Sequence, residues 1–137
     1  MSRLLVDTSV WIEFLRDTGS PACEQVGRLL TEPELRVVTT PPIVMELLAG
    51  ATSEASVRSL EQLTSGIESL TVEPALDFHA AAAAYRACRS RGTTVRGLMD
   101  CLLAVIAERH GVTLVHRDAD LGRLAACLPN LATVDLR

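Results

Sequence analysis

The sequence predicts an α/β protein in which a central, mostly parallel five-stranded sheet lies between two layers of helices. Three observations predict this fold. Short apolar, β-branched runs alternate with longer segments of helical periodicity. Hydrophobic residues make up 48% of the 137 positions, enough to fill the core of one domain over residues 1–137. A strand, a helix and a second strand in succession form a right-handed crossover, and such crossovers build parallel sheets covered on both faces.

Five short segments have the composition of strands. Most are rich in Leu, Val, Ile and Thr, and turn residues or helical patterns bound them. In chain order, the predicted strands are 3–6, 35–39, 67–72, 112–116 and 131–134. Aromatic residues are only 3% of the chain, so we expect aliphatic side chains to pack this sheet.

The segments between the strands carry helix start and stop signals. Ser20 followed by Pro21 is typical of an N-cap with proline at the first helical position, and Ser53 is a second N-cap candidate. Gly50 follows one helical pattern directly and is expected to end it. In chain order, the predicted helices are 9–16, 21–30, 41–49, 54–64, 74–89, 98–108 and 119–126.

Composition limits where the chain can act. The apolar run at residues 4–6 is far too short for a signal peptide or a membrane span, and no other stretch is long enough and free of charge. We therefore expect a cytoplasmic protein. The cysteines form no C-x-x-C pair, and Cys88, Cys101 and Cys127 lie among apolar residues or alanines, so we expect these three to be buried.

Acidic residues stand at the ends of two predicted strands. Asp7 directly follows residues 3–6, and Asp118 lies just beyond 112–116, with Asp120 two residues further. Sites in parallel sheets form outside the carboxyl ends of the strands, so chemistry is expected here. Each aspartate could instead only cap the helix that follows it. Asp118 is preferred over Asp120 because it lies nearer the strand end.

Two further acids lie in otherwise apolar helices. Glu46 has only apolar residues at 43–45 and 47–49, and no basic residue lies within a turn of it. This pattern predicts a buried helix, and a buried carboxylate needs a metal or a partner. Asp100 precedes the apolar run 101–107, although an acid in a first turn could merely favour the helix dipole.

Together these four acids suit a hard divalent cation. The chain contains no lysine to pair with them, because every basic side chain other than histidine is arginine. Mg²⁺ and Mn²⁺ are typically held by carboxylates, with water completing the coordination shell. Such a site can activate water and stabilise charge on a phosphodiester. The acids therefore predict metal-dependent hydrolysis.

Four stretches resemble the successive acidic motifs of PIN-domain ribonucleases. They are Val6-Asp7-Thr8-Ser9-Val10-Trp11, Met45-Glu46-Leu47-Leu48-Ala49-Gly50, Asp100-Cys101-Leu102-Leu103-Ala104 and Arg117-Asp118-Ala119-Asp120-Leu121. Their order and the chain length resemble the VapC-type toxins of bacterial toxin–antitoxin pairs, and the resemblance covers nearly the whole chain. It implies a PIN-like three-layer α/β/α sandwich, an Mg²⁺- or Mn²⁺-dependent endoribonuclease, a homodimer and a cognate VapB-type antitoxin.

The resemblance also implies roles for individual residues. Catalysis and metal binding fall on four acids, namely Asp7, Glu46, Asp100 and Asp118. Thr8 and Ser9 match the hydroxyl residues beside the first aspartate, and Asp120 matches a frequent additional acid. His116 stands where the family often has Thr or Ser, and Leu121 where it often has Phe. Neither departure removes a carboxylate, but the role of a hydroxyl at position 116 stays open.

Clustered arginines offer contacts for an RNA substrate. The formal net charge of −4 argues mildly against nucleic acid, but the distribution of the arginines argues for it. Arginine binds phosphate well because its planar group makes paired hydrogen bonds. The candidates are Arg86, Arg89, Arg91 and Arg96 in one segment, and Arg117 beside the fourth acid. For any one of them taken alone, a solvated helix face is the preferred interpretation.

This chain lacks the residues that define other phosphate-handling folds. A receiver-type phosphoacceptor domain needs a lysine, and a dinucleotide-binding domain needs G-x-G-x-x-G where residues 7–9 read Asp-Thr-Ser. A metallophosphatase-like hydrolase would place a second aspartate at Ser9. One alternative stays open, a scaffold of this kind that binds RNA or protein without cleaving it. A nuclease assay with and without EDTA distinguishes the two.

Overall fold

The computed structural model of the chain describes residues 2–17 and 19–137, which form five strands and seven helices. The strands are β1 (Ser2–Val6), β2 (Leu35–Thr39), β3 (Glu68–Ser69), β4 (Thr113–His116) and β5 (Thr133–Asp135). The helices are α1 (Thr8–Leu15), α2 (Pro21–Thr31), α3 (Pro41–Ala49), α4 (Glu54–Ser65), α5 (Pro74–Ser90), α6 (Leu98–His110) and α7 (Ala119–Cys127). Every predicted element is present, in the predicted order.

All five strands join one parallel sheet in the order β3-β2-β1-β4-β5. Leu5 of β1 lies opposite Val38 on one side and Leu114 on the other. The chain builds outward from β1 to β3 and then returns to the other side of β1 for β4. This reversal puts a topological switch point between β1 and β4, where the crevice outside the carboxyl ends forms a binding site in such sheets.

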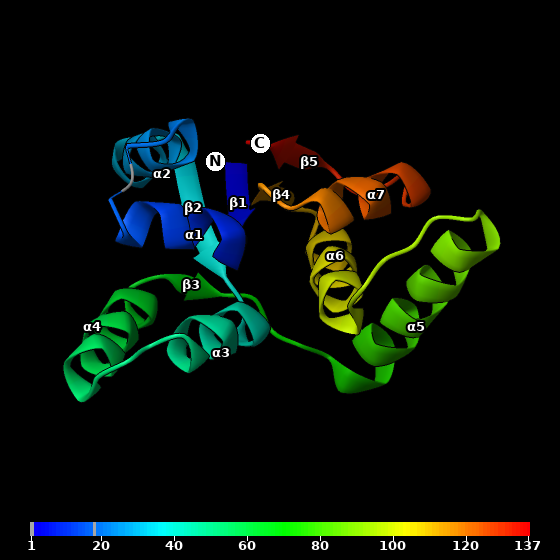
Figure 1. Cartoon of the computed structure of the whole chain (residues 1–137), viewed down its shortest axis with the longest axis horizontal. Helices are drawn as coiled ribbons and strands as arrows, with labels where there is room; N and C mark the ends of the chain where they lie inside the picture. The colour runs from blue at the N-terminus through cyan, green and yellow to red at the C-terminus, as the bar shows by residue number, and fades with distance from the viewer. Residues whose placement is uncertain (1, 18) are drawn as a thin grey trace.

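Helices cover the sheet in two groups (Figure 1). The helices α1 to α4 lie on one side of the strands and α5 to α7 on the other. Helix α1 contacts α2, α3 and β4, whereas α6 contacts β4, α5 and α7. The α/β fold with helices on both faces is therefore confirmed. No helix within the described residues is long and apolar enough to cross a membrane.

The core is aliphatic, as the scarcity of aromatics predicts. Residues 101–107 of α6 are buried without interruption, because this helix is apolar on every side and lies between the sheet and α5. Trp11 is only 1% exposed and packs edge-on against Phe14. Cys88, Cys101 and Cys127 are buried free thiols, as expected, and so is Cys23.

The edge strand β3 is much shorter than predicted. The segment 67–72 was expected to be a strand, but only Glu68 and Ser69 pair with β2. An edge strand has one neighbour, so nothing on its outer side prolongs it. After Leu70 donates its N–H to the Thr39 carbonyl, the chain leaves the ladder, and the Thr71 carbonyl instead accepts from Arg109. The predicted bounds of β2 and α3 are confirmed, and the ends of the other elements differ from the prediction by at most two residues.

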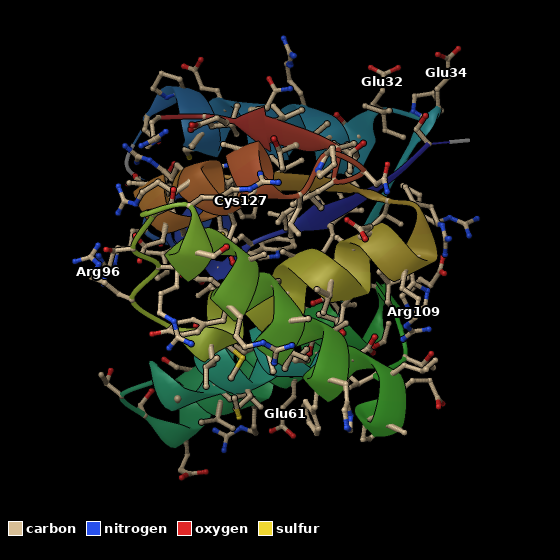
Figure 2. The ribbon with its side chains drawn as sticks, turned by 90° about the vertical axis from the view of Figure 1, so that its right-hand side faces the viewer. Glu32, Glu34, Glu61, Arg96, Arg109 and Cys127 are labelled. Carbon is tan, nitrogen blue, oxygen red and sulfur yellow. The ribbon has the colours of Figure 1, made fainter. Side chains whose placement is uncertain are left out.

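A buried ion pair joins the amino end of α5 to the carboxyl end of α6. Asp77 is 1% exposed and accepts two hydrogen bonds of 2.8 Å from Arg109, and it also caps the backbone N–H of Glu73. Figure 2 shows Arg109 and Arg96 at opposite edges of this face of the molecule. The Asp77–Arg109 ion pair therefore holds α6 at its carboxyl end, whereas Asp100 lies in the first turn at the opposite end.

Candidate metal centre

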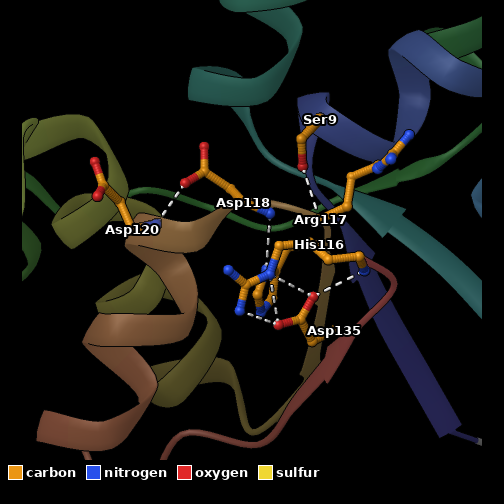
Figure 3. Close-up of polar contacts among 7 residues, drawn as sticks. Ser9, His116, Arg117, Asp118, Asp120 and Asp135 are labelled. Carbon is orange, nitrogen blue, oxygen red and sulfur yellow. Dashed lines mark hydrogen bonds and ion pairs between the residues drawn. The ribbon is translucent and has the colours of Figure 1, made fainter.

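Asp7 begins the site at the carboxyl end of β1. It caps α1, since its Oδ2 accepts from the N–H of Ser9 at 3.0 Å and from the Ser9 hydroxyl at 2.6 Å. The Ser9 hydroxyl in turn accepts from the backbone N–H of Arg117 at 3.1 Å. Ser9 thereby connects the end of β1 to the end of β4 across the switch point (Figure 3).

Asp118 mirrors this arrangement at the carboxyl end of β4. It caps α7, because its Oδ1 accepts from the N–H of Asp120 at 2.7 Å. Its own N–H is donated to Nδ1 of His116 at 3.2 Å (Figure 3). Both strand-end aspartates are therefore helix caps, and both also lie at the switch point. A cap uses one carboxylate oxygen, so the capping role leaves the other oxygen for chemistry.

Asp100 lies in the first turn of α6 and faces the other acids. Burial raises its pKa to about 7, with further upward contributions from the charges of Asp118, Asp7, Asp120 and Glu46. One carboxylate oxygen from each of Asp100, Asp118 and Asp120 lies within 4.8 Å of the other two. Among the described residues, this is the one trio of potential metal ligands that lies so close together.

Glu46 reaches the cluster from α3. Its Oε1 accepts from the Thr8 hydroxyl at 3.2 Å. Burial raises the pKa of Glu46, the charges of Asp7 and Asp118 raise it further, and the Thr8 hydrogen bond opposes them. The prediction that α3 is buried on every side is wrong, since Met45 is 52% exposed. Helix α3 packs on α1 and α4 at the rim of the molecule, so Glu46 is half-buried at a surface.

Asp120 is the acid of this cluster that has two guanidinium partners. It is 4% exposed, and its Oδ2 accepts from the backbone N–H of Arg96 at 3.3 Å and from its Nε at 3.2 Å. The guanidinium of Arg123 donates to the other oxygen. Burial alone would raise the pKa of Asp120, but the Arg123 and Arg96 donors outweigh it and lower the pKa. Arg123 was not among the predicted site residues, although its i,i+3 spacing from Asp120 on a helix was a signal for the pair.

The predicted arginines divide into three groups. Arg86, Arg89 and Arg96 line one cavity of about 480 Å³ together with Tyr85 and Leu98, and Arg89 lies over the Tyr85 ring at 5.7 Å. Arg96 joins this cavity to Asp120, with a side chain that is 78% exposed. Arg91 caps the end of α5 and does not line the cavity. Arg117 is ion-paired with Glu13 of α1.

The donor chemistry fits a divalent cation of the Mg²⁺ or Mn²⁺ type. The site offers carboxylate oxygens and the hydroxyls of Thr8 and Ser9, which are hard ligands. The raised pKa of Asp100 shows that its negative charge lacks full compensation from the protein, and a cation would supply it. Among the five acids of this site, and within the described residues, Asp120 alone forms ion pairs with guanidinium groups.

Comparison with known proteins agrees with this geometry. Residues 4–126 match the PIN domain family. The chain belongs to the PIN domain family. It is 47% identical over 134 residues to VapC ribonuclease Mb1587 of Mycobacterium bovis and to ribonuclease VapC11 of Mycobacterium tuberculosis, matches that cover 98% of this chain and 99% of each relative. A crystal structure of VapBC2 from Rickettsia felis, bound to a DNA fragment from its promoter, shares the fold with a TM-score of 0.74 at 15% identity, covering 98% of this chain and 99% of that one.

All four acids that the PIN domain resemblance selected come to one end of the sheet. Asp7 and Asp118 follow neighbouring strands, while Asp100 and Glu46 enter from helices of the two opposite groups. The charges of the other three contribute to the raised pKa of Asp100, so the acids are close enough to interact. This PIN domain therefore concentrates negative charge at its topological switch point.

Proposed function

We propose that this PIN domain is an Mg²⁺- or Mn²⁺-dependent endoribonuclease and the toxin of a toxin–antitoxin pair. The observation that carries the proposal is the convergence of Asp7, Glu46, Asp100 and Asp118 at the switch point, with the pKa of Asp100 raised to about 7. Relatives named VapC ribonucleases that match 98% of the chain at 47% identity support the same activity.

Each acid has a distinct part in this proposal. Asp100 and Asp118 would hold the cation together with Asp7, and Glu46 would complete the negative surface from α3. When bound, such a cation activates a water molecule and stabilises the charge that develops on the phosphate. Asp7 and Asp118 are held in orientation by their capping hydrogen bonds, so little freedom has to be lost when they bind a ligand.

Neighbouring side chains prepare the site for RNA. Ser9 keeps the ends of β1 and β4 at a fixed separation, and Thr8 directs Glu46 toward the cluster. Asp120 positions the exposed guanidinium of Arg96 beside the acids, where it can bind a phosphate and offset their repulsion of RNA. Arg86 and Arg89 extend this basic surface along α5. Arg91, which caps the end of α5, and Arg117, which is paired with Glu13, lie outside this surface.

The proposal includes two protein partners. An antitoxin of the VapB type would control the site, and a cavity of about 550 Å³ between α1, α3 and α4 supports this because it joins Thr8 and Glu46 to the apolar side chains of Ile12 and Leu15. Exposed apolar side chains such as Leu98 and Phe78 support a homodimer, since burying them against a second copy would be favourable. A toxin that cuts cellular RNA would act in the cytoplasm.

A cleavage assay on a defined RNA tests the proposal. We expect cleavage with Mg²⁺ or Mn²⁺, none in EDTA, and recovery when excess Mn²⁺ is added back. Asp118→Asn should reduce the rate at least a hundredfold because it removes a cation ligand. Glu68→Gln is the matched control, since Glu68 is an ion-paired acid on β3 outside the cluster. Full activity in EDTA would contradict the proposal, and RNA binding without cleavage under every condition would favour a non-catalytic module.

A further inference from the structure

His116 is completely buried at the carboxyl end of β4, two residues before Asp118. Its ring Nδ1 accepts the backbone N–H of Asp118 at 3.2 Å (Figure 3). A ring nitrogen that accepts an N–H must carry a lone pair, so the proton of the neutral ring lies on Nε2. Among the described residues Nε2 has no hydrogen-bond partner. The one side-chain hydrogen bond of this imidazole is therefore the one to Asp118.

This hydrogen bond runs from residue i+2 back to residue i. Serine and threonine make the same connection in an ST turn, where the hydroxyl accepts the N–H two residues on. His116 therefore does with a ring nitrogen what a hydroxyl could do at this position. Because Asp118 also accepts from Asp120 N–H at 2.7 Å, its backbone and its carboxylate are each held by one hydrogen bond.

The surroundings of His116 hold the ring in place. Its carbonyl accepts from the N–H of Leu136 at 2.7 Å, and it lies opposite Asp135 in the ladder between β4 and β5. Asp135 is ion-paired with Arg137, whose guanidinium lies so close to Gly122 that a Cβ there would be 2.9 Å from it. Strand β5 thus lies beside His116, and Arg137, which follows this strand, reaches α7 at Gly122.

We propose that His116 is a positioning residue that orients Asp118 for cation binding. It acts through the backbone of Asp118 and touches neither the cation nor the RNA. A buried polar ring with a single polar contact costs stability relative to an apolar side chain, so packing alone does not account for a histidine at this position. The inference rests on the proposed function, because it concerns how Asp118 is oriented to bind the cation.

The test compares His116→Thr with His116→Val. The two variants have nearly the same shape and leave the same space behind, but only threonine can accept the Asp118 N–H. We expect Val to lower Mn²⁺ affinity about tenfold, the usual scale for residues behind a metal ligand, whereas Thr stays within about threefold of wild type. Calorimetric Mn²⁺ titration measures the affinity, and thermal melts in EDTA measure the stability of both variants.

Hydrogen exchange of the Asp118 amide supplies a readout that needs no metal. It should be slow in wild type and His116→Thr and faster in His116→Val. Equal exchange and equal Mn²⁺ affinity in the two variants would overturn the inference, as would an affinity that simply follows melting temperature. If wild type itself failed to bind Mn²⁺, the proposed function would fail while the exchange data still decided the role of His116. Should the smaller side chains prevent folding, His116→Asn against His116→Leu makes the same comparison.

Discussion

At the scale of single residues, Asp100 shows how the fold makes a reactive acid. Two effects raise its pKa to about 7, burial first and then the charge of Asp118 and the other acids. In the unfolded chain this carboxyl has its ordinary pKa of 3.8. Because the pKa is higher in the folded state, ionisation of Asp100 lowers the stability of the fold. The destabilisation is absent below pH 4, grows as the pH rises from 4 to 7, and levels off above 7.

Replacing Asp100 with asparagine should therefore separate stability from function. In EDTA at pH 8, Asp100→Asn should be more stable than wild type by on the order of 1 kcal/mol, because the neutral amide avoids the cost of a buried charge. The difference should shrink as the pH falls and vanish near pH 4, where wild-type Asp100 is also neutral. Denaturant melts at several pH values measure this difference.

Added Mn²⁺ should reverse the order of stability. Wild type should gain stability because the cation binds only the folded site, whereas Asp100→Asn should gain little. Glu68→Gln controls for the loss of any one acid, since Glu68 lies on β3 and pairs with Arg3 and Arg36. If Asp100→Asn melts clearly lower than wild type in EDTA and still responds fully to Mn²⁺, then Asp100 has a structural role and does not bind the cation.

The strand-end aspartates were predictable because their positions follow from local sequence. Asp7 and Asp118 each come after a short apolar run and before a helix, so both the cap and the site could be inferred. Cap and site were predicted as alternatives, but Asp7 and Asp118 each cap a helix and also lie at the switch point. The pairing of Asp120 with Arg96 was not predictable in the same way, because Arg96 is 24 residues distant and only the folded chain brings the two together.

At the scale of elements, α5 and the loop after it form the basic surface of the molecule. Arg86 and Arg89 point into the cavity that Arg96 shares, while Arg91 lies outside it. Pairing with Asp120 already neutralises part of the charge of Arg96, so the two helical arginines are the freer phosphate ligands. This division refines the expectation that all arginines of the segment contact RNA alike.

The Arg86→Ala, Arg89→Ala double variant should bind single-stranded RNA more weakly, and its binding should depend less on salt. Each lost phosphate contact lowers the slope of log affinity against log salt by about 0.7 for a single strand. The measurement is an RNA titration at several salt concentrations in the Asp100→Asn background, which keeps the RNA uncut. Arg91→Ala is the matched control and should leave the slope unchanged. If the slope is the same in the double variant and in wild type, these arginines belong to a solvated helix face and do not contact RNA.

Element boundaries were predicted where a local signal marks them and were missed where packing decides. Ser20 and Ser53 cap their helices as expected because capping needs only adjacent backbone. The burial of α3 was overestimated because its apolar sequence says nothing of its place at the rim, where Met45 is left exposed. Strand β3 was predicted too long because its sequence does not show that the strand has one neighbour.

At the scale of the whole molecule, the strand order makes the site. Parallel strands put Asp7 and Asp118 at the same end of the sheet, and the strand order reverses between β1 and β4, which is where ligands bind in sheets of this kind. The alternation of strands and helices predicted the parallel sheet. It did not predict which strands are neighbours, since the order β3-β2-β1-β4-β5 depends on where each crossover packs. The pairing of Arg117 with Glu13, 104 residues apart, could not be predicted either, because it also depends on how the folded chain packs.

Control by an antitoxin should depend on the apolar cavity between α1, α3 and α4. Ile12→Asp and Leu15→Asp should abolish co-purification with the product of the neighbouring reading frame, because a charge on this face opposes an apolar segment. Leu30→Asp is a control of similar exposure on α2. Pull-down and growth assays measure the effect. An Ile12→Asp toxin that stays bound to its partner, and harmless to its host, would place the antitoxin elsewhere.

The central claim is that these carboxylates cut RNA by hydrolysis with the help of a divalent cation. Mapping the ends of the cleaved RNA tests it most directly, because the attacking group determines which product carries the phosphate. Attack by water at this site should leave a 5′-phosphate and a 3′-hydroxyl, and the products should be absent with Asp100→Asn or EDTA. A 2′,3′-cyclic phosphate would show that the ribose hydroxyl is the nucleophile, and it would contradict the account.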